Sequence, residues 1–185
     1  MITEAGNDPQ VAALVYIAAG APNSGESFND WLKDYTSMPG VGEIKPYGKD
    51  GYVAFTQLGV RQVAQDLPKE ESDLVYAVQG PLAARCFDDK ISTAAWHTKP
   101  SWYIVSSEDH AIPPAVESDS ARRMKATTLT LASSHVPMVS QPDKVAAFIL
   151  KAVTTLNANS HADKTPGGRS LKISRPSYLP AISAR

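Results

Sequence analysis

The feature that most constrains this chain is an uninterrupted apolar run near its start. Residues 11–19 read VAALVYIAA, and Gly20 and Pro22 close the run. A strand with this pattern carries apolar side chains on both faces, so both faces must be covered, as they are in parallel sheets. The run therefore predicts a buried strand of a parallel sheet.

Two later runs extend the pattern. Residues 102–106 (WYIVS) and 127–132 (TTLTLA) read as strands, and each ends in a polar turn. Helices are expected at 114–125 and 142–156, because each stretch begins with a proline, which suits the first turn of a helix. Strands that alternate with helices are typical of right-handed βαβ crossovers. The predicted fold class is α/β, with parallel strands and flanking helices.

The stretch 24–98 interrupts this alternation. It is rich in aromatic residues and lies between two core strands, so we interpret it as a helical cap or lid over a site. A helical layer with no functional role has the same pattern. Short helices are expected within it at 26–35, 56–66 and 69–79. The expected core then consists of residues 1–23 and 99–156.

Residues 157–185 form the third predicted region. They are basic and rich in proline, glycine and serine, with little apolar surface to pack, so we expect a disordered basic tail. A basic tail of this kind is either a solvated extension or a contact to nucleic acid or membrane.

Composition excludes several classes of function. The formal net charge of -1 gives no attraction to nucleic acid. No apolar run reaches the roughly 18 residues of a membrane helix, and the start lacks the features of a signal peptide, so a cytoplasmic protein is expected. Cys86 is the single cysteine, which excludes an internal disulfide and a CxxC metal site. It lies in PLAARCF, where we expect a helix and a buried thiol.

The candidate chemistry lies just beyond the second and third predicted strands. Asp109 follows one strand and His135 follows the other, and working residues of open α/β sheets gather at these carboxyl ends. A carboxylate beside an imidazole fixes the tautomer of the ring and stabilises its protonated form, which is the arrangement of a general base. Taken singly, such an aspartate can cap a helix, and such a histidine can bind a backbone carbonyl. We expect His110, next to Asp109, to be a surface residue.

Three segments resemble the α/β-hydrolase family, in particular its small esterase-like members, which include plant methyl-ester hydrolases and hydroxynitrile lyases. PSWYIVSSEDHAIPP (100–114) resembles the acid loop, SSHVPMVSQPDKVAAFIL (133–150) the histidine loop and last helix, and VAALVYIAAGAPNSGES (11–27) the strand that leads into the cap. The resemblance covers roughly residues 1–156. It implies that Asp109 is the acid and His135 the general base, with no metal and no organic cofactor.

The resemblance also implies a small-molecule, ester-like substrate and a partial form of the family fold with a helical cap. Four cap aromatics are candidates to bind an apolar substrate, although the core of a cap has the same composition. These candidates are Phe28, Trp31, Tyr35 and Phe55.

The nucleophile of that family is absent from the sequence. Its serine lies in GxSxG on a turn between strand and helix, and no GxSxG occurs in the 185 residues. The opening MITEAG resembles the helix after that turn, which would place the serine about five residues before Met1. We therefore expect a serine hydrolase that is inactive as this chain, either because the chain is truncated or mis-started, or because it is a short protein used for binding.

The second hypothesis is a non-catalytic protein that holds a ligand in the cleft beneath the cap. With three strands, the sheet would also leave an apolar edge at residues 11–19, which invites self-association. Neither a nucleic acid nor a membrane is expected as a partner of the core.

Overall fold

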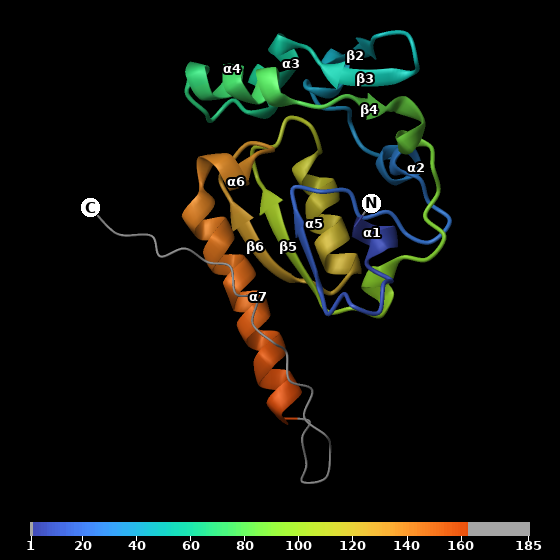
Figure 1. The fold of residues 1–185 in the computed structure, drawn as a ribbon, viewed down its shortest axis with the longest axis vertical. Coiled ribbons are helices and arrows are strands. Elements are labelled where there is room, and N and C mark those ends of the chain that lie inside the picture. The colour runs from blue at the N-terminus through green and yellow to red at the C-terminus, as the bar shows by residue number, and fades with distance from the viewer. Residues whose placement is uncertain (1, 163–185) are drawn as a thin grey trace, which may run out of the picture.

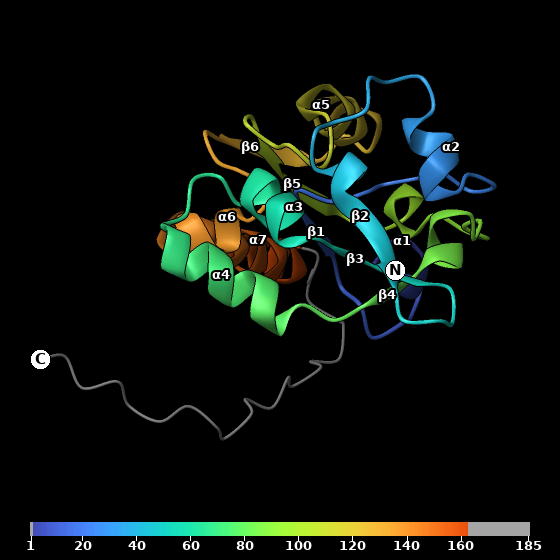
Figure 2. The same cartoon turned by 90° about the horizontal axis from the view of Figure 1, so that it is seen from above.

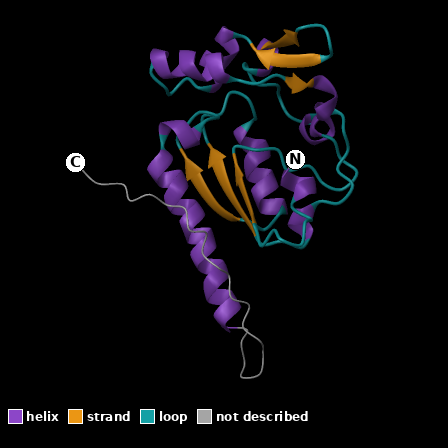
Figure 3. Cartoon of the chain, viewed as in Figure 1, coloured by secondary structure: helices purple, strands orange, loops and turns teal. Residues whose placement is uncertain are grey.

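The computed structural model describes residues 2–162. Its core is a three-stranded parallel sheet in the order β1-β5-β6 (Figures 1 and 3). The strands are β1 (Leu14–Ile17), β5 (Ser101–Ser106) and β6 (Thr127–Leu131). Every residue of β5 is buried, because it is the central strand and has a helical layer on each face. The predicted parallel α/β sheet is confirmed.

Side chains alternate between the two faces of this sheet. On one face, Tyr16 stacks on Tyr103, with ring centroids 5.7 Å apart, and α5 packs beside them. On the other face, Trp102 and Ile104 pack against Phe148 of α7. The core helices and short turns are α1 (Ile2–Ala5), η3 (Ala95–His97), α5 (Pro114–Arg123), α6 (Pro137–Ser140) and α7 (Pro142–Ala162).

The segment between β1 and β5 forms a separate layer beyond the carboxyl ends of the core strands (Figure 1). Seen from above, the layer with α3, α4 and β2 lies in front of the core (Figure 2). Two of its helices, α2 and α3, begin at side-chain caps: the Ser27 hydroxyl accepts a hydrogen bond from the Asp30 N–H, and the Thr56 hydroxyl accepts one from the Gly59 N–H. The elements are α2 (Phe28–Leu32), η1 (Val41–Glu43), β2 (Ile44–Tyr47), β3 (Tyr52–Phe55), α3 (Gln57–Val63), α4 (Lys69–Val78), β4 (Leu82–Ala83) and η2 (Ala84–Phe87).

The cap is not purely helical, which corrects our expectation. Strands β2, β3 and β4 form an antiparallel sheet of their own. Gly48 and Gly51 bound the β2–β3 turn, and both have positive φ angles, which glycine adopts without a steric penalty. Tyr47 and Tyr52 flank the sequence GKDG, which is typical of a hairpin turn. The two strands are only four residues long, so their alternation is too short to predict strands from the sequence.

Two other expectations need correction. Helix α7 continues to Ala162, so residues 157–162 are helical, because no proline or glycine interrupts the chain between Pro142 and Pro166. The rest of the predicted tail, 163–185, lies outside the described residues. Cys86 is exposed in the short turn η2, so it is not a buried core thiol. Within residues 2–162, no helix is both long and apolar enough to cross a bilayer.

Candidate active site

Asp109 lies in the loop that follows β5. Its side chain is completely buried. The backbone N–H groups of Ala111 and Ile112 both donate to Oδ1 of Asp109, the latter at 2.9 Å. An aspartate that binds amides two and three residues ahead shapes its own turn. The carboxylate is therefore held by local backbone before any distant residue contacts it.

His135 lies in the loop that follows β6. Its Nδ1–H donates to Oδ2 of Asp109 at 2.6 Å, a distance typical of a charge-assisted hydrogen bond. The His135 side chain is 28% exposed, in contrast to the fully buried aspartate. Because Nδ1 carries the proton in this arrangement, Nε2 is left to accept one.

The electrostatics favour an ionised aspartate. Burial alone would raise the pKa of Asp109, but the hydrogen bond from His135 and the electrostatic attraction to that ring outweigh burial, so the pKa lies below its ordinary value of 3.8. At neutral pH, Asp109 is therefore a buried carboxylate whose charge faces the imidazole. A carboxylate placed in this way orients the imidazole ring. Among the described residues, no group of three or more His, Cys, Asp or Glu side chains is placed to hold a metal ion.

The cap holds both loops from above. Hydrogen bonds run from the backbone of each loop to residues around α3 or to the segment before η1. They join Val63 O to His135 N (3.1 Å), Asp66 Oδ2 to Ser134 N (3.0 Å), Gln65 Nε2 to Glu108 O (2.5 Å) and Gly40 N to His110 O (2.8 Å). The aspartate and histidine loops are thus fixed relative to each other by a segment that is distant in sequence.

An apolar cavity of about 620 Å³ lies between the cap and the core, and His135 is part of its wall. Two of the four predicted aromatics, Phe28 and Phe55, line it. The remaining wall residues are mostly small or aliphatic and come from the loop after β1, from α2, from the cap strands, from the short turns η1 and η2 and from the loop after Asp109. A cavity of this size accommodates a small organic molecule, and the lining favours an apolar one.

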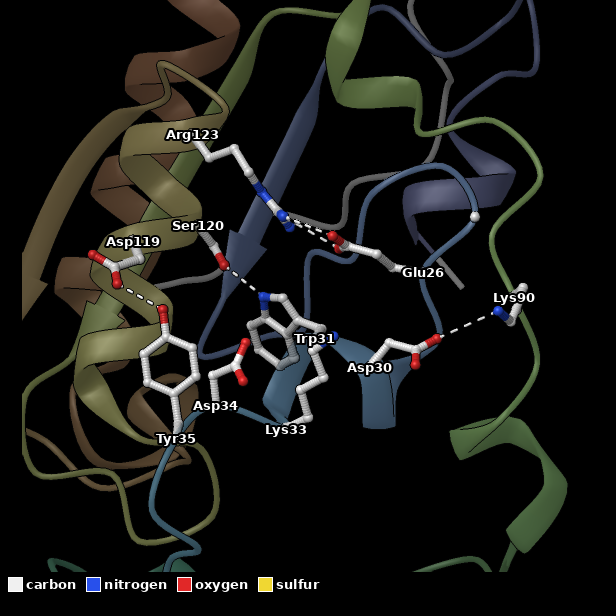
Figure 4. A pocket seen from close by; sticks show the side chains of 11 residues that line it. Glu26, Asp30, Trp31, Lys33, Asp34, Tyr35, Lys90, Asp119, Ser120 and Arg123 are labelled. Atoms are coloured by element: carbon white, nitrogen blue, oxygen red, sulfur yellow. Dashed lines mark hydrogen bonds and ion pairs between the residues drawn. The ribbon is translucent and has the colours of Figure 1, made fainter.

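The other two predicted aromatics, Trp31 and Tyr35, point away from this cavity. Phe28 and Leu32 of α2 line the cavity. Trp31 lies on another face of this short helix, and Tyr35 lies in the turn that follows it; both contact α5. Trp31 Nε1–H donates to Ser120 Oγ at 2.8 Å, and the Tyr35 hydroxyl donates to Asp119 Oδ2 at 2.6 Å (Figure 4). Both side chains therefore attach α2 to the core, and we leave them out of the candidate site.

The pocket around them, about 530 Å³, is polar (Figure 4). Ion pairs occupy its walls, between Arg123 and Glu26 at 3.2 Å and between Lys90 and Asp30 at 3.8 Å. The Arg123 guanidinium also lies 5.4 Å from the ring centroid of Trp96. The charged side chains in this pocket are paired with each other, so we interpret the pocket as a polar contact between cap and core.

One buried acid beside Asp109 could not be predicted from the sequence. Glu117 on α5 is completely buried, and its Oε2 accepts a hydrogen bond from the Ser106 N–H at 3.0 Å. In PAVESDS a glutamate reads as a solvent-facing helix residue, because glutamates are almost never fully buried without a partner. His110 also differs from expectation: it is half-buried, and its buried Nδ1 has no hydrogen-bond partner among the described residues.

Comparison with known proteins places this geometry in context. The model of the alpha/beta hydrolase family matches residues 1–148. The alpha/beta hydrolase nvfD of Aspergillus novofumigatus is 25% identical over 146 residues, which cover 77% of this chain and 57% of that protein. This chain therefore spans a little over half the length of that curated relative.

Solved structures agree on the fold. Polyneuridine aldehyde esterase superimposes with a TM-score of 0.65 and 17% identity, covering 82% of this chain and 65% of that one. A pyrethroid hydrolase from Sphingobium faniae JZ-2 gives a TM-score of 0.62 at 16% identity, with 86% and 66% covered. At these identities the likeness concerns the fold.

Proposed function

Since the chain belongs to the alpha/beta hydrolase family, we propose that it contributes the acid and the general base of a serine hydrolase that acts on a small ester. In this proposal, Nε2 of His135 takes the proton of the serine hydroxyl as the serine attacks the ester carbonyl. The same nitrogen returns the proton to the leaving alcohol. Asp109 orients the ring and stabilises its protonated form.

The observation that carries the proposal is the 2.6 Å hydrogen bond between His135 and Asp109 at the wall of an apolar cavity. The acid is buried and ionised, and the base is partly exposed to the space where a substrate would lie. Phe28 and Phe55 in that wall favour an apolar acyl or alcohol group.

The nucleophile of this mechanism is not among the 185 residues, since GxSxG does not occur in them. Without a serine and the amide donors that stabilise the oxyanion, an acid–base pair has nothing to activate. We therefore propose that these residues by themselves do not turn over esters.

The test compares two proteins with p-nitrophenyl butyrate as substrate. One is the 185-residue chain, and the other is the same chain joined to the in-frame coding sequence before Met1. We expect background hydrolysis from the first. If the added sequence carries GxSxG, we expect turnover from the second that His135→Ala abolishes and Asp109→Asn lowers by about 10⁴-fold, as in a serine protease.

His97→Ala is the matched control, because His97 is exposed and pairs with Asn23, away from the cavity. It should leave the rate unchanged. The assignment fails if the longer protein keeps its rate after His135→Ala. Turnover by the 185-residue chain that depends on His135 would overturn the proposed inactivity.

A second candidate function is ligand binding without turnover. It is favoured by the presence of an apolar cavity of about 620 Å³ in a sequence without GxSxG. In that case, p-nitrophenyl butyrate should bind unchanged and shift the NMR signals of residues lining the cavity. Val53→Trp, which fills the cavity, should weaken binding, whereas Val78→Trp on the exposed face of α4 should not.

The proposal also covers the partners and the location of the protein. A small ester-like molecule is the proposed partner, and neither a nucleic acid nor a membrane is part of it. The single cysteine suits a reducing compartment, which favours the cytoplasm. Self-association through the outer edge of β1 also belongs to this proposal.

A further inference from the structure

Glu117 lies directly beneath the aspartate loop, in a place where a charged group is costly. Its Oε2 accepts from the N–H of Ser106, the last residue of β5. Its Oε1 is buried and receives no hydrogen bond from any donor among the described residues. The group that this carboxyl meets is the carboxyl of Asp109. Two acceptors therefore face each other unless one of them carries a proton.

The surroundings decide which carboxyl holds that proton. Asp109 receives N–H donors from Ala111, Ile112 and His135, all of which stabilise its charge. Burial, followed by the adjacent Asp109 carboxylate, raises the pKa of Glu117 to about 10. The other titratable side chain facing Glu117 is Tyr103 on β5, whose pKa is raised by burial and then by Glu117. The cluster thus holds one negative charge, on Asp109.

We propose that Glu117 is a positioning residue for Asp109: its protonated carboxyl donates a hydrogen bond to Asp109 and holds that carboxylate with Oδ2 toward His135. This inference rests on the proposed function, because it assigns Glu117 to the same acid–base pair. Glu117 then bridges the end of β5 and the aspartate loop. Its Oε2 accepts from Ser106, and its Oε1–H donates to Asp109.

The chemistry of this bridge requires a neutral group that accepts at one atom and donates at another. Glutamine meets that requirement, since its carbonyl accepts and its amide donates. Leucine has a similar volume but does neither. It would leave the Ser106 N–H and one side of Asp109 without partners. Glu117→Gln should therefore preserve the geometry, and Glu117→Leu should release the Asp109 carboxylate.

The first measurement is the infrared carbonyl band of a protonated carboxyl in the 185-residue chain at neutral pH. We expect this band in the wild type, its loss in Glu117→Gln, and its loss in the wild type as the pH rises toward about 10. Glu108→Gln is the matched control, because Glu108 is an exposed glutamate next to Asp109. It should keep the band. A wild type without the band, or a Glu117→Gln variant that retains it, would overturn the proposal.

The second measurement follows the His135 ring by ¹⁵N NMR. The wild type, Glu117→Gln and Glu108→Gln should all show one tautomer with the proton on Nδ1. Glu117→Leu, if folded, should show a mixture of tautomers. The same single tautomer in folded Glu117→Leu would contradict the positioning role. If that variant does not fold, the infrared comparison of wild type and Glu117→Gln decides the matter.

Neither measurement needs a nucleophile or turnover, so the outcomes for the two proposals are separate. An extended enzyme that does not hydrolyse esters would refute the proposed function while leaving the infrared and NMR results intact. Conversely, an active esterase without the protonated-carboxyl band would refute only the role of Glu117.

Discussion

At the residue scale, the site contains three neighbouring titratable groups but only one buried negative charge, which lies on Asp109. Asp109 is ionised, Glu117 is neutral, and His135 completes the pair from the cavity side. A carboxyl that stays protonated in the folded state and ionises in the unfolded state couples folding to pH. The direction of that coupling follows from which state binds the extra proton.

Glu117→Gln should change the pH dependence of stability. Between its ordinary pKa of 4.5 and its folded value of about 10, Glu117 binds a proton only in the folded state, so its contribution to stability falls as the pH rises. The pKa of Asp109 is lowered instead, so the stability that its ionisation contributes is already fully present well below neutral pH and does not change around neutrality. Relative to wild type, the free energy of unfolding of the variant should rise by about 1.4 kcal/mol per pH unit around neutrality.

Urea denaturation at a series of pH values measures this difference, and contributions common to both proteins cancel in it. For Glu108→Gln, at an exposed neighbouring position, the difference in the free energy of unfolding from wild type should not change with pH. A flat difference for Glu117→Gln as well would mean that Glu117 is ionised in the folded protein.

At the element scale, α3 and the turn after it determine where the histidine loop lies. The backbone of that loop donates to Val63 and to the carboxylate of Asp66, both outside the core sheet. Burial opposes ionisation of Asp66, but hydrogen bonds from Ser134 outweigh it and lower the pKa of Asp66. The cap therefore positions the loop of His135 and also forms a wall of the cavity.

Asp66→Ala should loosen the histidine loop without unfolding the core. It removes the acceptor of the Ser134 N–H, and a hydrogen bond to a charged group contributes about 1.5–3 kcal/mol. Amide hydrogen exchange at Ser134 and His135 should accelerate by at least about tenfold, while β5 stays protected. Asp73→Ala removes a half-buried carboxylate that pairs with Arg61 and Lys69, and it is the control. Unchanged exchange at both amides in Asp66→Ala would show that α3 does not hold the loop.

At the scale of the whole molecule, β1 is an outer strand of the core sheet. Leu14 and Ala18 donate their N–H groups to carbonyls on the β5 side. Because alternate residues of a strand in a parallel sheet bond to opposite sides, the backbone groups of Val15 and Ile17 face the outer edge. An edge of this kind pairs readily with another strand.

Val15→Pro should weaken self-association, since proline removes an N–H at the outer edge and leaves the bonds to β5 in place. Sedimentation velocity over a range of concentrations should show association in the wild type and a several-fold higher dissociation constant in the variant. Circular dichroism checks that the variant is folded. Val78→Lys tests general surface apolarity on α4 and should associate like the wild type. A wild type that stays monomeric at every concentration would refute association through this edge.

Local patterns in the sequence determined the order of the core elements. The apolar runs and the prolines that begin helices predicted β1, β5, β6, α5 and α7, because strand and helix periodicities are properties of short segments. The right-handed crossover then places successive carboxyl ends along one edge. That rule was enough to predict Asp109 and His135 as neighbours. In the structure, Nδ1 of His135 lies 2.6 Å from Oδ2 of Asp109.

Only the tertiary structure decided what each side chain faces. It turned Phe28 toward the cavity and Trp31 toward α5, exposed Cys86, paired the short cap strands, and buried Glu117 against Asp109. None of these contacts can be predicted from a short segment, because the burial of a side chain depends on residues that are distant in the sequence. The protonation of Glu117 is the clearest case: it follows from the low polarity and the neighbouring charge that packing creates, and no pattern in residues 114–123 encodes it.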